Sequence, residues 1–140
     1  MTTPELPFFV YGTLRPGEVN HDRYLRGRTA VEEPGRLGGA VLYDGPGYPY
    51  AVEAPQGAVH GELVTPLPER YGRLLAELDR LEEYVAGDPG NLYERVARDV
   101  RRPDGSAVHA WVYVAAPAVA ARLRARGTLI EGGDWHGRRG

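Results

Sequence analysis

One carboxylate of this chain falls where an apolar side chain would be expected. The segment Glu69–Tyr84 predicts a helix, because its apolar residues recur at helical spacing. The members of this apolar stripe are Tyr71, Leu74, Leu75, Leu78 and Leu81. At about 100° per residue, Glu82 lies roughly 40° from the centre of the stripe, while its acidic neighbours lie on the flanks or the far side. An inward carboxylate loses hydration, which raises its pKa and suits it to general acid/base catalysis near neutral pH.

The same sequence pattern also allows a structural role for Glu82. An inward carboxylate is also expected where it forms an ion pair, and Arg95 is a candidate partner. Glu82 lies in the last predicted turn of the helix, where the chain can already face solvent. An open cleft at Glu82 would favour catalysis, and a closed ion pair would favour the structural role.

A glycine-rich turn offers a second group for chemistry. The predicted buried strand Pro7–Tyr11 runs into Gly12-Thr13-Leu14-Arg15-Pro16-Gly17. Successive free N–H groups in such a turn can bind a carboxylate or a developing oxyanion. The same composition is also typical of a plain corner between a strand and a loop. No phosphate-binding P-loop is present, because Gly17 is followed by Glu18 rather than by Lys.

The composition excludes several other kinds of chemistry. The chain has 140 residues, no Cys, and 17 cationic residues that are all Arg, so thiol and lysine Schiff-base chemistry are excluded. The single Ser, Ser106, lies in a turn and is a poor triad nucleophile. His21, His60, His109 and His136 lack close ligand spacing, so we expect no metal and no cofactor. With a net charge of −2, we expect no nucleic-acid partner.

The elements that must position these residues fit one α+β domain over residues 1–140. Short β-favouring pieces separated by Gly and Pro predict a small curved sheet or barrel. They are Arg28–Val31, Leu37–Tyr43, Tyr50–Glu53 and Val59–Thr65. A hairpin of Tyr93–Arg101 and Ala107–Val114 and helices at Asn20–Leu25 and Pro117–Arg126 complete the prediction.

We expect a soluble cytoplasmic protein without a membrane partner. The first five residues lack the basic start and apolar stretch of a signal peptide. The longest apolar run, Ala110–Ala121, is too short to cross a bilayer and contains Pro117.

Several separated motifs together resemble the gamma-glutamylcyclotransferase-like family, in particular its bacterial gamma-glutamylamine cyclotransferase type. The motifs span almost the whole chain in the family's order. They are Phe9-Val10-Tyr11-Gly12-Thr13-Leu14-Arg15 with Gly17 and Asn20, Gly45-Pro46-Gly47-Tyr48-Pro49, His60-Gly61-Glu62-Leu63, Leu78-Asp79-Arg80-Leu81-Glu82, Tyr93-Glu94-Arg95 and Gly133-Asp134-Trp135. One position departs from the pattern, because the family often has Gly after the catalytic Glu and this chain has Glu83.

The resemblance implies a small mixed or antiparallel β-barrel with flanking helices and a pocket beside the exit of the first strand. It implies that Glu82 is the acid/base and that the turn grips a small-molecule gamma-glutamyl substrate. The expected substrate-binding residues are Tyr11, Gly12, Thr13, Leu14, Arg15, Tyr48, Tyr93 and Tyr113.

The implied reaction cleaves a gamma-glutamyl amide. The alpha-amine of the substrate attacks its own gamma-carbonyl, which releases 5-oxoproline and a free amine. The alternative is a metabolite-binding or regulatory module with an idle pocket. The sequence leaves open whether the protein is a monomer or a homodimer, and which amine the substrate carries.

Overall fold

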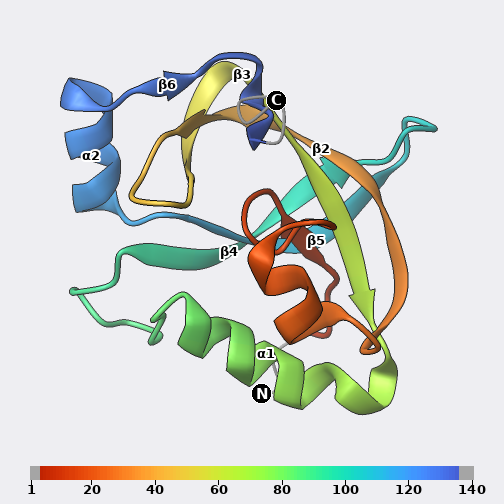
Figure 1. Cartoon of the computed structure of the whole chain (residues 1–140). Coiled ribbons are helices and arrows are strands. Elements are labelled where there is room, and N and C mark those ends of the chain that lie inside the picture. Colours follow the sequence, from red (N-terminus) through yellow and green to blue (C-terminus); the bar gives the residue numbers. More distant parts are fainter. Residues whose placement is uncertain (1–3, 136–140) are drawn as a thin grey trace.

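The computed structural model describes residues 4–135, and a closed five-stranded barrel lies at the centre of that part of the chain (Figure 1). Around the barrel the strands follow the order β3-β1-β5-β4-β2, and β2 pairs again with β3 to close it. Only the contact of β1 with β5 is parallel; the other pairings are antiparallel. The bounds are β1 Phe8–Val10, β2 Thr29–Tyr43, β3 Tyr50–Pro66, β4 Tyr93–Arg101 and β5 Ala107–Ala115. This arrangement confirms the predicted α+β barrel with flanking helices.

Two long strands replace the four short pieces predicted between residues 28 and 65. β2 and β3 pair along almost their whole length, and the prediction that Gly and Pro interrupt them was wrong. The chain instead absorbs these residues as irregularities within the strands. The register shifts between Gly38 and Ala40, and Gly39 between them has a φ of 77°, which favours glycine. Bulges of this kind bend long strands, and the bending lets a small barrel close.

Helices cover the outside of the barrel (Figure 1). The main predicted helix is divided into a 3₁₀ turn, η2 (Pro68–Arg70), and α1 (Tyr71–Leu81). The brief helix predicted at residues 20–25 is a π-helical segment, η1 (His21–Leu25), which lies beside α1. The second helix, α2, has the predicted bounds Pro117–Arg126. A two-residue strand, β6 (Leu129–Ile130), pairs with the end of β2, and the 3₁₀ turn η3 (Glu131–Gly133) follows it.

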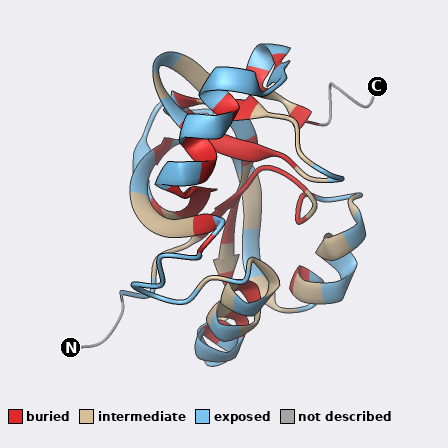
Figure 2. Ribbon diagram, turned by 90° about the vertical axis from the view of Figure 1, so that its left-hand side faces the viewer, coloured by how far each residue is buried: buried red, intermediate tan, exposed pale blue. Residues whose placement is uncertain are grey.

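The apolar residues form two cores, one on each side of the barrel wall. The interior core includes Phe9, Leu63 and Val112, and the outer core joins the barrel to the helices. Figure 2 shows buried residues gathered on the central strands and exposed residues on the outward sides of the helices. In α1 the buried residues are Tyr71, Leu74 and Leu78. The predicted apolar stripe is therefore the face that α1 turns to the barrel.

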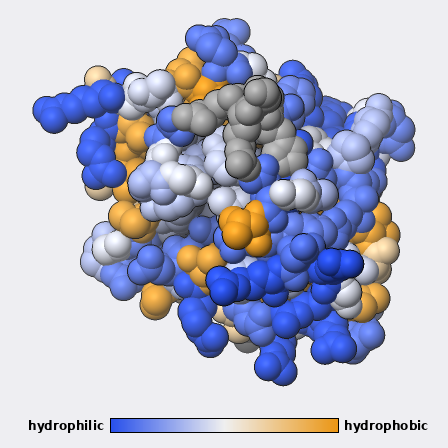
Figure 3. Space-filling model, viewed as in Figure 1, coloured by the Kyte–Doolittle hydropathy of each residue, from blue (hydrophilic) through white to orange (hydrophobic). Residues whose placement is uncertain are grey.

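The chain after β6 completes the interior core. Trp135 is buried there. No helix among residues 4–135 is long and apolar enough to span a membrane. Hydrophilic residues cover most of the face seen in Figure 3. Residues 1–3 and His136, which contributed to the predictions on targeting and metal binding, lie outside the described residues.

Candidate functional site

A cavity of about 190 Å³ lies where the turn after β1 meets the end of α1 and the start of β4. Its lining residues come from segments that are far apart in the sequence. They are Phe9, Val10, Tyr11, Gly12, Thr13, Leu14, Asn20, Tyr48, Pro49, Leu81, Glu82, Glu83, Leu92, Tyr93 and Tyr113. The glycine-rich turn and Glu82, predicted independently from the sequence, therefore share one cavity.

Glu82 is the C-terminal cap residue of α1 and is half-buried. Its carboxylate forms no hydrogen bond or ion pair with any residue that the structure describes. Burial raises the pKa of the Glu82 carboxyl to about 7, because desolvation penalises the charged form. A carboxyl with this pKa is divided between its base and acid forms at neutral pH, as a proton carrier must be.

The end of α1 is held in a defined geometry by its own backbone. The N–H of Glu83 donates to the carbonyl of Arg80 at 3.1 Å, and the N–H of Tyr84 donates to the carbonyl of Asp79 at 2.8 Å. These two bonds form a Schellman motif, which requires a left-handed residue after the cap. Glu83 takes this conformation with a φ of 54°, and it is the only non-glycine residue with positive φ in the described part of the chain. The Glu that departs from the family pattern thus makes the tight turn usually left to Gly.

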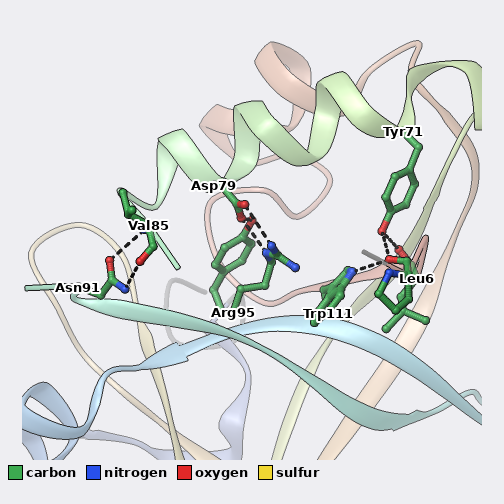
Figure 4. Close-up of polar contacts among 9 residues, drawn as sticks. Leu6, Tyr71, Asp79, Val85, Asn91, Arg95 and Trp111 are labelled. Carbon is green, nitrogen blue, oxygen red and sulfur yellow. Dashed lines mark hydrogen bonds and ion pairs between the residues drawn. The ribbon is translucent and has the colours of Figure 1, made fainter. Parts of the chain in front are cut away.

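Asp79, one turn before Glu82, ties the same helix end to the barrel. Its Oδ1 accepts a hydrogen bond from the Tyr113 hydroxyl at 2.6 Å and another from Nε of Arg95 at 2.9 Å. Figure 4 shows Asp79 reaching down from α1 and Arg95 reaching up from the sheet to meet it. The Arg95 guanidinium also lies over the Trp111 ring, 4.4 Å from its centroid. Arg95 therefore pairs with Asp79, and the alternative that it pairs with Glu82 is wrong.

The turn after β1 lines the cavity and contains unused hydrogen-bond donors. The backbone N–H groups of Gly12, Thr13 and Leu14 donate no hydrogen bond to another described residue. The turn is closed by the N–H of Arg15, which donates to the Gly12 carbonyl at 3.0 Å. Consecutive free amides of this kind form a concave site for an anionic oxygen.

Asn20 holds this turn in place. Its backbone N–H donates to the Thr13 carbonyl at 2.9 Å, and its side-chain Nδ2 donates to Thr13 Oγ1 at 2.9 Å. The Thr13 hydroxyl accepts this bond, and no described residue accepts its proton. Its O–H therefore adds one more donor to the free amides.

Gly12 is required by close packing rather than by an unusual backbone angle. Its φ is not in the positive region, but a Cβ at this position would lie 2.8 Å from Cδ of Pro49. Pro49 is held in turn by Tyr93, whose hydroxyl donates to the Pro49 carbonyl at 2.8 Å. The turn, the loop before β3 and the start of β4 are thus locked together at the cavity wall.

The predicted tyrosines all line the cavity, but three of their hydroxyls have partners in the protein. Tyr11 donates to the Tyr113 carbonyl at 2.5 Å, Tyr93 to Pro49 and Tyr113 to Asp79. Burial is the largest cause that raises the pKa of each of these three hydroxyls, so they stay protonated. Tyr48 packs edge-on against Tyr50, whose ring stacks on Tyr93. The tyrosines therefore form an aromatic wall, and these three hydroxyls do not titrate near neutral pH.

Arg15 does not line the cavity, although it was predicted to bind substrate. Its buried guanidinium donates to Glu62 Oε1 at 2.8 Å and to Asp134 Oδ1 at 2.8 Å. These bonds connect the turn to β3 and to the segment after β6. We therefore assign Arg15 a structural role in fixing the turn.

Several lining or supporting residues were missed as site residues in the sequence, among them Asn20, Pro49 and Asp79. These three occur in the quoted motifs, but only their contacts show what they do. Asp79 lies on the flank of the apolar stripe, and that position alone resembles an ordinary surface carboxylate. No cluster of three or more His, Asp or Glu that could hold a metal occurs among residues 4–135.

The fold and the cavity together define a class of protein. It is a small α+β barrel in which the end of a helix, carrying a desolvated carboxylate, and the turn after a strand line the same cavity. The chain belongs to the family described as "Gamma-glutamyl cyclotransferase, AIG2-like", whose model matches residues 8–137. This membership confirms the resemblance found in the motifs.

Two curated relatives agree with this family. The chain is 36% identical over 107 residues to a protein of Niallia circulans named gamma-L-glutamyl-butirosin B gamma-glutamyl cyclotransferase. That match covers 76% of this chain and 64% of the relative, so the chain spans less than two thirds of that protein's length. It is also 36% identical over 127 residues to a putative gamma-glutamylcyclotransferase of Vibrio cholerae, with 91% and 92% of the two chains covered.

Solved structures show the same fold. An uncharacterised protein of Pyrococcus horikoshii, PH0828, superposes with a TM-score of 0.65 at 26% identity, covering 96% of this chain and 92% of the other. Protein ytfP of Escherichia coli superposes with a TM-score of 0.62 at 29% identity, covering 96% and 100%.

Proposed function

We propose that this protein cleaves gamma-glutamyl amides by an intramolecular cyclisation that releases 5-oxoproline and a free amine. The observation that carries the proposal is the Glu82 carboxyl, which has no partner among the described residues and whose pKa burial raises to about 7. Family membership supports the same chemistry. A small barrel does not need an unpartnered, desolvated carboxyl for stability, because such a group costs free energy in the folded state.

The reaction begins with a proton transfer to Glu82. The ionised Glu82 takes a proton from the alpha-ammonium group of the substrate, and the free amine attacks the gamma-carbonyl carbon of the same molecule. The attack forms a carbon–nitrogen bond and a five-membered ring. Because both reacting groups belong to one molecule, holding it in a folded conformation replaces the work of a nucleophilic side chain. This fits a chain without Cys or Lys.

The turn after β1 supplies the hydrogen bonds that orient the substrate. The free N–H groups of Gly12, Thr13 and Leu14 bind either the alpha-carboxylate or the oxyanion that develops on the gamma-carbonyl oxygen. The Thr13 hydroxyl adds a donor on the same side. The aromatic wall of Tyr48 and Tyr93 confines the aliphatic part of the gamma-glutamyl group.

The reaction ends when Glu82 returns its proton. The tetrahedral intermediate collapses, the amide carbon–nitrogen bond breaks, and the protonated Glu82 donates to the departing nitrogen. Glu82 then takes a second proton from the ring nitrogen, which must keep only one hydrogen in 5-oxoproline, and passes it to the amine. The proton balance closes, because both protons lost by the alpha-ammonium nitrogen leave on the amine product, which departs as an ammonium ion. The pKa near 7 permits both steps at neutral pH.

The test is the release of 5-oxoproline from a panel of gamma-glutamyl amides by the purified protein and by Glu82→Gln. We expect release by the wild type and not by the variant. The control Glu69→Gln removes the same charge from the exposed η2 turn and should keep full activity. Binding of these amides without 5-oxoproline release by the wild type would instead identify a non-catalytic module.

A further inference from the structure

The charged side chains that line the cavity are all acidic. Among the described lining residues only Glu82 and Glu83 carry a formal charge, and neither Arg nor His is present. The gamma-glutamyl half of a substrate brings its own carboxylate, which the free amides of the turn accommodate. Glu82 is the proposed acid/base, so Glu83 is the charge that remains to meet the other half of the substrate, the amine.

Glu83 has no side-chain partner among residues 4–135. Its carboxylate forms no hydrogen bond or ion pair with a described residue, whereas the two acidic side chains within α1 do so. Glu77 pairs with Arg28, and Asp79 pairs with Arg95. Glu83 is exposed, lines the cavity and follows Glu82 directly in the chain. It thus leaves a negative charge at the mouth, beside the proposed acid/base.

The backbone at Glu83 is one that glycine would adopt at lower cost. A non-glycine residue in the left-handed region costs about 1–2 kcal/mol, and here the Schellman motif requires it. Strain retained at the edge of a cavity indicates that the side chain is used there. The backbone conformation favours Gly, and no side-chain contact in the described part of the chain accounts for Glu83.

Apolar residues lie beside this charge. Leu81 and Leu92 also line the cavity, and Leu92 is 41% exposed although it is a large hydrophobic residue. An aliphatic stem of the departing amine could pack on these side chains while its far end meets Glu83. Because Glu82 and Glu83 are consecutive residues that line the same cavity, a short aliphatic stem suits the path from the reacting amide to the second charge.

We propose that Glu83 determines the specificity of the site, by selecting gamma-glutamyl amides whose amine half carries a second, positively charged group on a short aliphatic stem. This inference rests on the proposed cyclisation at Glu82 and adds the substrate class to it. The carboxylate of Glu83 pairs with the distal ammonium, and the stem lies against Leu81 and Leu92.

The test uses two substrates of nearly equal shape that differ in charge. The mono-gamma-glutamyl amide of diaminopropane has a distal ammonium, and the gamma-glutamyl amide of butylamine has a methyl group in its place. The kcat/KM for 5-oxoproline release is measured for both. We expect the wild type to prefer the cationic amide by roughly threefold to fivefold, the size expected for a partly exposed ion pair.

Two variants and added salt show whether Glu83 is responsible. Glu83→Gln keeps the length of the side chain and should bring the preference close to one, whereas the matched control Glu69→Gln should keep the wild-type preference. Salt should reduce the preference of the wild type, because the Debye length at 0.15 M is only about 8 Å.

The outcomes separate this inference from the proposed function. Equal kcat/KM for the two amides, or an unchanged preference in Glu83→Gln, would overturn the role of Glu83 while the cyclisation stands. If the wild type releases 5-oxoproline from neither amide nor from any other gamma-glutamyl amide, the proposed function fails and the inference falls with it.

Discussion

Asp79 and Glu82 lie one turn apart at the end of the same helix, yet their carboxylates have opposite surroundings. Asp79 accepts hydrogen bonds from Arg95 and Tyr113, while Glu82 meets no partner among the described residues and lines the cavity. The paired carboxylate anchors the helix end to the barrel, and the unpaired one is the group that we propose exchanges protons with the substrate.

Replacing Glu82 by Gln removes the proton carrier and keeps the shape of the side chain. We expect kcat for 5-oxoproline release to fall by at least about 100-fold, the lower end of general acid/base effects. Circular dichroism should show an unchanged fold. A variant that retains more than a tenth of wild-type kcat would contradict the role of Glu82.

The pKa of Glu82 also predicts how stability depends on pH. Burial raises the pKa from its ordinary value of 4.5 to about 7 in the folded protein. Between these values the folded state holds a proton that the unfolded state has released, so the Glu82 contribution to stability is fully present below pH 4.5 and is lost as pH rises to about 7. The loss is at most about 3 kcal/mol, reduced by water entering the cavity.

The measurement is the free energy of unfolding of wild type and Glu82→Gln from pH 4 to pH 8.5. The free energy of unfolding of the variant should rise relative to that of the wild type as pH increases through this window. The difference between the two should level off above about pH 8. Parallel curves for the two proteins would show that the Glu82 pKa is not raised in the folded state.

Replacing Thr13 by Ala should affect substrate binding more than folding. The hydroxyl donor to the substrate is lost, so we expect KM to rise several-fold, while loss of the Asn20 bond costs about 1 kcal/mol of stability. Thr13→Ser keeps the hydroxyl and should restore most of the wild-type KM. Unchanged kinetics in Thr13→Ala would remove Thr13 from the binding site.

Replacing Glu83 by Gly should stabilise the protein. The left-handed conformation at φ 54° is strained for Glu and easy for Gly. We expect a gain of about 1 kcal/mol after the greater backbone freedom of Gly in the unfolded chain is subtracted. Thermal unfolding should show a rise of a few degrees, and a decrease would indicate that Glu83 has a stabilising contact in solution.

Replacing Asp79 by Asn should loosen the helix end. Hydrogen bonds to charged groups contribute about 1.5–3 kcal/mol each, so we expect a loss of roughly 2 kcal/mol in chemical denaturation. A double-mutant cycle with Tyr113→Phe should give a coupling of about 0.5–3 kcal/mol. Asp99→Asn, an exposed carboxylate on β4 that contacts His109, is the matched control and should cost under about 0.5 kcal/mol. Additive losses in the cycle would mean that Asp79 and Tyr113 do not stabilise each other.

Periodicity explains why much of the helical and hairpin structure was predictable. The apolar stripe of α1 and the inward direction of Glu82 follow from 3.6 residues per turn, which is a local property. The hairpin of β4 and β5 follows from alternating residues around a Pro-Asp-Gly turn. Long strands that continue through Gly and Pro were mispredicted, because pairing between β2 and β3 outweighs the local preference for a break.

The sequence by itself determined that a carboxylate would face inward near residue 82 and that a glycine-rich turn would follow the first strand. Only the tertiary structure decided which charges pair, because an arginine can reach several carboxylates and the fold selects one. It placed Arg95 against Asp79 and Arg15 against Glu62 and Asp134, and left Glu82 and Glu83 without partners among residues 4–135. Pairing and desolvation depend on segments far apart in the chain, and these two quantities decide which carboxylate carries a proton.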